Sequence, residues 1–259
     1  MNAYDKVMAA RDSKRLTAVD YINKMFGSSF IEMHGDRRFG DDKAIVGGLA
    51  MLYDQPITVI GIEKGRNTKE RMNRNFGSAN PEGYRKALRL MKQAEKFHRP
   101  VFCLVDTSGA YPGIGAEERG QGLAIAENLM EMMTLKTPVL SIIIGEGGSG
   151  GALALAVADE VWMLEDSIYS VISPEGCASI LWKDSSKAPE ASNCLKLTSH
   201  DLFDLGVIER IIREPVDSDD RKMFEGLKML VARTFEKNMA VDTDKLIDTR
   251  YARFRKFGK

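Results

Sequence analysis

Glycine is concentrated in one short stretch of the sequence, where a catalytic site could use its bare backbone. Five of the seven residues from Gly145 to Gly151 are glycine, between an apolar run and an Ala/Leu run. Glycines where a strand turns into a helix leave backbone N–H groups free and let a ligand approach closely. Three kinds of site use such a turn, and a close-packed corner without any ligand is the alternative.

A dinucleotide site is the first interpretation. Gly145, Gly147 and Gly150 satisfy G-x-G-x-x-G after a predicted strand, and Glu165 follows 20 residues after Gly145, where an acid that binds a ribose is expected. The predicted helix after the turn is short, and an earlier strand–helix unit precedes it. The match is therefore weak.

A nucleophile elbow is the second interpretation. Residues 147–151 read G-G-S-G-G and fit G-x-S-x-G, with Ser149 as the nucleophile of a serine hydrolase. Asp184 and His200 follow in the chain order of such a triad. However, Ser199 looks like a helix N-cap, which favours a surface position for His200. This alternative stays open at the sequence level.

An oxyanion hole is the third interpretation, because two free N–H groups can hold a carbonyl oxygen that becomes negative during a reaction. A second glycine-rich loop, 107–122, contains Gly109, Gly113 and Gly115 and follows the preceding predicted strand. We expect both loops to meet at one pocket, which corner packing alone does not require. Glu117 and Glu118 are expected to open the next helix and to stabilise its positive N-terminal end.

The elements that must position these loops alternate regularly. A hairpin of strands is predicted at 44–52 and 57–65, a helix at 81–97, and strands at 101–106, 139–145, 161–165 and 169–173. Strands that alternate with helices favour a parallel α/β core with right-handed connections. Helices are expected at 1–26 and are expected to dominate after Pro174, so we predict one domain with a helical C-terminal extension.

Composition excludes several classes of protein. Lys plus Arg and Asp plus Glu both total 37, so no global charge attracts nucleic acid or an anionic membrane. The three cysteines form no C-x-x-C pair, which argues against a zinc site. The first residues lack the apolar stretch of a secretory signal, and no run of about 18 apolar residues occurs. We expect a cytosolic protein and a solvated basic tail at 250–259.

Three long segments together resemble one known family. Residues 83–122, 144–183 and 196–212, which include "VDTSGAYPGIGAEERGQG" and "IGEGGSGGALALAVADEVW", are similar to the carboxyltransferase α subunit of bacterial acetyl-CoA carboxylase. The likeness runs from about Phe30 to the C-terminal region. One departure is Ser108, where the family carries proline in "DTPGAYPG".

The resemblance implies an α/β crotonase-like fold, a spiral of β-β-α units. It implies a single carboxyltransferase domain over 1–259, with a helical N-terminal segment at about 1–30, a crotonase-like core at about 30–215 and a helical C-terminal extension at about 216–259. The implied activity transfers the carboxyl group of carboxybiotin, on a separate biotin carboxyl carrier protein, to acetyl-CoA. The product is malonyl-CoA, in the first committed step of fatty-acid biosynthesis.

The family also implies partners and site residues. Partners would be a zinc-ribbon β subunit in an α2β2 assembly and biotin carboxylase in the wider complex, with no metal in this chain. Gly150 and Gly151 would form the oxyanion hole for carboxybiotin. The expected substrate-binding residues are Gly147, Gly148, Gly109, Ala110, Tyr111 and Gly113. The basic segment 64–74 contacts CoA phosphates or is a solvated loop, and both remain open.

Overall fold

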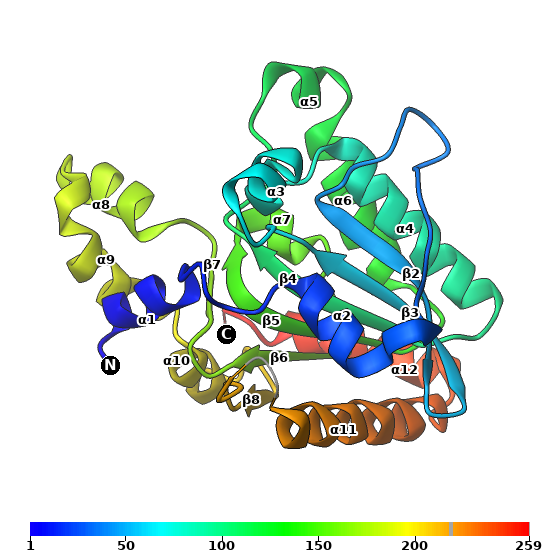
Figure 1. The fold of residues 1–259 in the computed structure, drawn as a ribbon. Helices are drawn as coiled ribbons and strands as arrows, with labels where there is room; N and C mark the ends of the chain where they lie inside the picture. The colour runs from blue at the N-terminus through cyan, green and yellow to red at the C-terminus, as the bar shows by residue number, and fades with distance from the viewer. Residues whose placement is uncertain (218–219, 259) are drawn as a thin grey trace.

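A single mixed sheet forms the centre of the described chain. The computed structural model describes residues 1–217 and 220–258, and the sheet that it contains is shown in Figure 1. Its strands are β1 (Ile31–Glu32), β2 (Ile45–Leu52), β3 (Gln55–Ile62), β4 (Val101–Thr107), β5 (Val139–Gly148), β6 (Glu160–Leu164), β7 (Ile168–Ser170) and β8 (Arg210–Ile212). The order is β1-β2-β3-β4-β5-β6-β8, and β7 pairs with β5.

The sheet combines an antiparallel edge with a parallel core. Strands β2 and β3 form the predicted hairpin, in which Leu52 pairs with Gln55. The chain reverses there through Tyr53, whose φ is 52°. Strands β3, β4, β5, β6 and β8 are parallel, which confirms the predicted parallel α/β core. Because parallel strands end at the same edge, the loops after β4 and β5 lie side by side.

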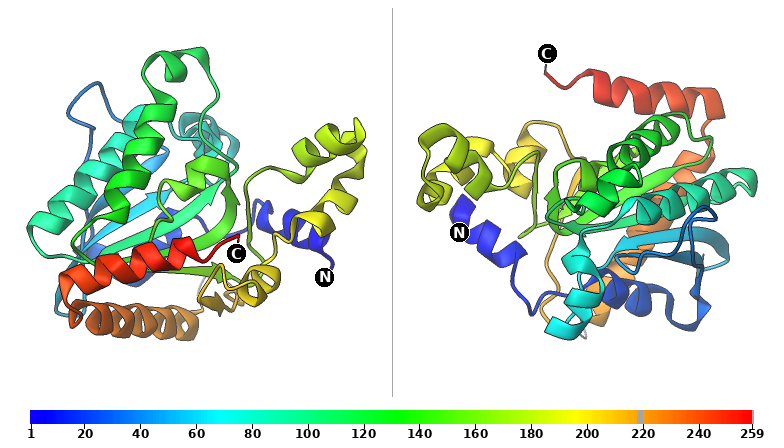
Figure 2. Two further views of the ribbon diagram at one scale, coloured as in Figure 1. Left: turned by 180° about the vertical axis from the view of Figure 1, so that it is seen from behind. Right: turned by 90° about the horizontal axis from the view of Figure 1, so that it is seen from above.

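Helices cover both faces of the sheet, as the two further views in Figure 2 show. On one face lie α4 (Pro81–Lys96), α6 (Gln121–Met133) and α12 (Thr243–Arg255). The other face is covered by α2 (Ala18–Phe26) and α11 (Arg221–Met239). The remaining helices are α1 (Ala3–Ala10), α3 (Thr68–Asn73), α5 (Ile114–Glu118), α7 (Ser149–Leu153), α8 (Pro174–Trp182), α9 (Ala188–Leu195) and α10 (Ser199–Asp204), with 3₁₀ turns η1 (Gly27–Ser29), η2 (Asn75–Gly77) and η3 (Ser185–Lys187).

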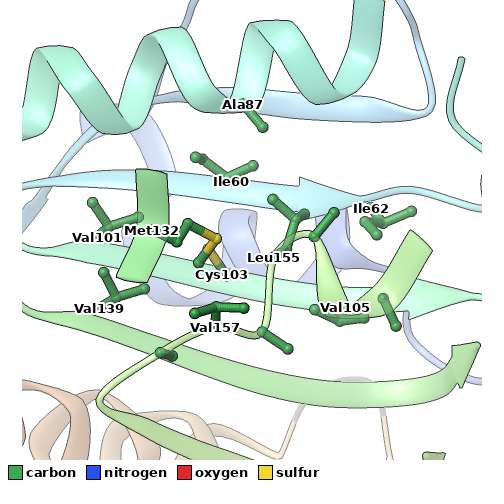
Figure 3. Packing of buried hydrophobic residues seen from close by; sticks show 14 of the residues in the cluster. Ile60, Ile62, Ala87, Val101, Cys103, Val105, Met132, Val139, Leu155 and Val157 are labelled. Atoms are coloured by element: carbon green, nitrogen blue, oxygen red, sulfur yellow. The ribbon is translucent and has the colours of Figure 1, made fainter. Parts of the chain in front are cut away.

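The core follows from the spacing of apolar residues. Ala87, Leu90, Met91 and Ala94 recur at helical spacing along α4 and are fully buried. Figure 3 shows Ala87 above Ile60, with Cys103, Val139 and Leu155 in the same cluster. A core of this kind holds β4 and β5 in register, and their ends position the glycine loops.

One group of helices projects away from the sheet. In Figure 1, α8 and α9 lie at one side of the molecule, next to α1. A small cluster of Val7, Ala10, Ile168 and Leu197 joins α1 to the sheet end and to the segment after α9. Within the described ranges, no helix is both long enough and apolar enough to cross a bilayer.

The C-terminal helix is fastened to the body by a buried arginine. Arg250 is 0% exposed and donates hydrogen bonds to both carboxylate oxygens of Asp159, at 2.9 and 2.8 Å. It also donates to the carbonyl groups of Met132, Leu135 and Thr137. The prediction of a solvated tail was therefore wrong for Arg250, because its charge is paired inside the protein.

Two local predictions also differ from the structure. The helix after the glycine turn, α7, has five residues, since the chain turns again at Ala154–Ala156. Glu117 and Glu118 are the last residues of the separate helix α5. They do not open the following helix α6, whose N-cap is the left-handed residue Gly120.

Candidate active site

The glycine turn presents two backbone N–H groups without a helical partner. Strand β5 ends at Gly148, and α7 begins at Ser149. Gly150 and Gly151 are therefore the second and third residues of α7, whose N–H groups find no acceptor within the helix. Among the described residues, neither group donates to a side chain or to a carbonyl outside the helix. Both are available to an oxygen with developing negative charge.

Close packing explains why glycine occupies most of this turn. A Cβ atom on Gly148 would collide with the carbonyl group of Ser108. A Cβ atom on Gly151 would lie 2.6 Å from the backbone nitrogen of Ala110 and 2.9 Å from the Tyr84 hydroxyl. The interpretation as a close-packed corner is thus correct for these two glycines. The same contacts bring both glycine-rich loops together, as the strand order predicts.

Gly150 differs from its neighbours. A Cβ atom there would meet only the Ile125 side chain, at the ordinary contact distance of 3.5 Å. Packing therefore does not demand glycine at this position. Glycine there leaves the approach to the N–H group open.

The second loop is shaped by hydrogen bonds within it. The Thr107 hydroxyl donates to the Gly109 carbonyl at 2.8 Å and accepts from the Gly109 N–H at 3.0 Å. Gly109 has a φ of 149°, which favours glycine. The backbone of Tyr111 is held by the Ala79 carbonyl at 3.0 Å, while its half-exposed ring covers Gly113. This loop contacts the turn through Ser108 and Ala110.

A buried network of charged side chains lies next to the turn, and it was not predicted from the sequence. Asp106 accepts a hydrogen bond from the Glu146 N–H at 2.9 Å, and the Lys64 ammonium lies 2.7 Å from Asp106 and 3.3 Å from Glu146. Burial opposes the charge of Lys64, but the two carboxylates outweigh it and raise the lysine pKa. Arg11 pairs with Glu146 at 2.9 Å. One signal was present: acidic residues at the ends of two buried strands need partners.

An apolar cavity of about 360 Å³ opens beside Gly150. Its walls come from β6, α7, β7, α10, the C-terminal helix α12 and the residues that adjoin these elements. They include Leu153, Val161, Tyr169, Val171, Leu202, Phe254 and Phe257, with Arg253 as the charged residue. The volume lies within the range of small-molecule sites.

The serine triad is not assembled. Ser149 is exposed, and within the described chain its hydroxyl makes no hydrogen bond to a histidine. The His200 ring is 63% exposed and lies 3.8 Å from Glu165, while the Asp184 carboxylate accepts from Ser186. Ser149 has a φ of 50°, so its backbone is strained as in a nucleophile elbow. His200 and Asp184, the base and the acid of the predicted triad, have other partners.

The dinucleotide interpretation also fails on geometry. Gly145 lies inside β5 rather than in the turn, and its missing Cβ makes room for the Asp106 carboxylate. Glu165 lies next to His200 at the molecular surface. Cys103 is not suited to act as a thiol nucleophile, because it is fully buried and burial raises its pKa to about 12. Across the described ranges, no three His, Cys, Asp or Glu side chains are grouped to hold a metal ion.

Comparisons with known proteins agree on one family. The family model "Acetyl co-enzyme A carboxylase carboxyltransferase-like" matches residues 1–258. The acetyl-coenzyme A carboxylase carboxyl transferase subunit alpha of Ruminiclostridium cellulolyticum is 61% identical over 258 residues, which cover 100% of this chain and 98% of the relative. The subunit alpha of Streptococcus pyogenes serotype M5 is 58% identical, with 96% of each chain covered.

Solved structures with low sequence identity share the fold. A Pseudomonas malonate decarboxylase hetero-tetramer in complex with coenzyme A contains a chain with a TM-score of 0.72 and 14% identity, covering 93% of this chain and 97% of that one. A transcarboxylase 12S structure gives a TM-score of 0.68 at 20% identity and covers 85% of this chain. This chain spans 43% of the transcarboxylase chain. These neighbours confirm the crotonase-like fold.

Proposed function

We propose that this chain is the α subunit of a carboxyltransferase, because it belongs to the acetyl-CoA carboxylase carboxyltransferase family. It would transfer the carboxyl group from carboxybiotin to acetyl-CoA and so form malonyl-CoA for fatty-acid biosynthesis. The observation that carries the proposal is the pair of free N–H groups on Gly150 and Gly151, at a turn that two glycine-rich loops hold together.

The chemistry assigned to this chain is electrostatic. As the carboxyl group leaves biotin, the ureido oxygen gains negative charge. The N–H groups of Gly150 and Gly151 would hold that oxygen, and a preorganised donor pair lowers the barrier. Gly147 and Gly148 set the path of the backbone into the turn. Gly109, Ala110, Tyr111 and Gly113 would form the wall against which biotin is placed, so positioning adds to the rate.

The described residues contain no assembled nucleophile and base, and this supports a site completed by a partner. We propose that a zinc-ribbon β subunit supplies the oxyanion hole for the acetyl-CoA enolate, in an α2β2 assembly. Carboxybiotin would arrive on the biotin carboxyl carrier protein after it is charged by biotin carboxylase. No metal is assigned to this chain.

We further propose one carboxyltransferase domain over 1–259, with its core at about 30–215 between the helical segments 1–30 and 216–259. The cytosol is the proposed compartment. Three free cysteines fit a reducing environment.

The reverse reaction tests the proposal directly. Malonyl-CoA and biocytin are incubated with this chain alone, and with the chain plus a zinc-ribbon β subunit, while acetyl-CoA formation is followed. We expect turnover only in the mixture. Turnover by the α chain alone would contradict the division of the two oxyanion holes between subunits. No turnover by a properly formed complex would overturn the proposed function.

A further inference from the structure

A second concave site lies on the outer face of the helical layer, among residues for which the proposed reaction gives no role. It is a groove of about 570 Å³ between the loop that follows β1 and the helices α4 and α6. We call it the arginine groove. It is lined by Arg37, Arg38, Arg85, Arg89 and Lys92, with Asp36, Leu88, Glu127 and Glu131. Five cations thus face three carboxylates.

The carboxylates of the groove are already engaged. The Asp36 carboxylate accepts a hydrogen bond from the Arg85 guanidinium at 2.8 Å. It also accepts hydrogen bonds from three backbone N–H groups of its own loop. Lys92 lies 3.1 Å from Glu131. Arg38 makes only a long contact of 3.7 Å with Glu127. The three acids of the groove therefore pair with Arg85, Lys92 and, over the longer distance, Arg38, and leave two cations unbalanced.

Arg37 and Arg89 are those cations. Both donate to the same acceptor, the carbonyl oxygen of His34, at 2.8 and 3.3 Å, so the two guanidinium groups converge on one point. Arg89 also donates to the Gly35 carbonyl at 3.0 Å. Within the described chain, neither arginine has a carboxylate within 4 Å. Most of the N–H donors of both groups remain free.

The guanidinium groups of Arg37 and Arg89 repel each other, and the fold holds them close together. Partial burial, and then the charge of Arg37, lower the pKa of Arg89 and outweigh the smaller opposing effects of Asp41 and Asp36. Arg37 has a φ of 66°, a left-handed conformation that is unfavourable for a residue with a Cβ atom. The loop thus places two like charges together in a strained backbone. Such strain persists at binding sites because the surrounding structure imposes it.

We propose that the arginine groove binds a phosphoryl group, held between Arg37 and Arg89 with Arg38 at the rim. Guanidinium forks match phosphate oxygens in geometry and form charge-assisted hydrogen bonds. Arg85 takes the role of a support, since its pairing with Asp36 fixes the loop. The site is distinct from the glycine turn, and the proposal does not depend on the carboxyl transfer.

Binding of inorganic pyrophosphate to the full chain tests this by calorimetry at constant ionic strength. We expect one site per chain, and at least tenfold weaker binding in the double variant Arg37→Gln/Arg89→Gln. The single variant Arg38→Gln removes a side chain that is 66% exposed and so keeps the fold; it should weaken binding severalfold. Lys222→Gln, at an exposed position of α11 on the opposite face of the sheet, should leave binding unchanged.

Two results overturn the proposal: pyrophosphate affinity that both arginine variants retain, or equal weakening by Lys222→Gln, which would mean diffuse charge attraction.

Competition then identifies the source of the phosphoryl group. If CoA displaces pyrophosphate and 3′-dephospho-CoA does not, the 3′-phosphate of CoA occupies the groove. If neither competes, CoA is not the ligand of the groove. The readout is binding without turnover, so its failure leaves the carboxyl-transfer proposal untouched.

Discussion

Gly151 and Ala110 lie so close that a Cβ atom on Gly151 would come within 2.6 Å of the Ala110 nitrogen. This contact joins the loop after β5 to the loop after β4. It makes the geometry of the oxyanion turn depend on the packing of two loops that are about 40 residues apart in the chain. The turn and the wall beside it therefore form one unit, and substitutions should separate packing from hydrogen bonding.

Gly151→Ala should damage the fold of the turn, whereas Gly150→Ala should not. The new methyl group at Gly151 has no room, so we expect a loss of about 1–3 kcal/mol in the free energy of unfolding. The methyl group at Gly150 meets Ile125 at an ordinary distance, and the change should stay within about 0.5 kcal/mol. Chemical denaturation of both variants measures this. Equal destabilisation would mean that packing also requires glycine at 150.

Gly150→Pro should remove one oxyanion donor, because proline has no N–H group. Gly150 is the second residue of α7, where the N–H group has no acceptor within the helix, so proline removes no helical hydrogen bond there. We expect the transfer rate of the complex with the β subunit to fall by about 10²–10³. Gly150→Ala keeps the N–H and serves as the matched control for added bulk. A proline variant as active as the alanine variant would remove Gly150 from the catalytic machinery.

Ser149 should be dispensable for catalysis. Its hydroxyl has no histidine partner in the described chain, so Ser149→Ala should change the transfer rate by no more than a few fold. Ser149→Gly also relieves the positive φ of 50° and should be slightly more stable than Ser149→Ala. The rates of both variants and labelling with an active-serine probe check this. Labelled wild-type protein together with an inactive alanine variant would revive the hydrolase alternative.

The hairpin, the parallel core and the meeting of the two glycine loops could be predicted from the sequence, since all three depend on local patterns. Apolar runs that alternate with helices indicated parallel strands, and glycines at two strand ends indicated one edge. The Lys64–Asp106–Glu146 network could not be predicted. It joins residues from three strand ends, and such pairs depend on the register of the sheet. The exposure of the charged tail could not be inferred from its composition either, because it depends on which distant residues pair with its charges.

Arg250 illustrates this limit and also gives a prediction. Arg250→Leu would leave the Asp159 carboxylate buried beside unpaired carbonyl groups. Removal of one partner of a buried ion pair costs about 3–5 kcal/mol, and we expect a loss of that size in the free energy of unfolding. Arg255→Leu, at an exposed position of the same helix, should change stability by less than about 0.5 kcal/mol. Similar losses in both variants would show that α12 is held by its general packing rather than by this arginine.

Asp36 should make the stability of the loop in the arginine groove depend on pH. Burial opposes the charge of this carboxylate, but backbone N–H groups of its own loop and the Arg85 guanidinium outweigh it and lower its pKa to about 2. A carboxylate with a lowered folded-state pKa stabilises the protein above its unfolded-state pKa, here about 3.8. That contribution, about 2 kcal/mol by linkage, is lost as the pH falls through the folded-state value. Asp36→Asn should therefore be less stable than the wild type at pH 6, and the difference should shrink toward pH 2. Urea denaturation at a series of pH values, with Asp54→Asn at an exposed turn as control, tests the sign, and a gap that widens on acidification would contradict the role given to Asp36.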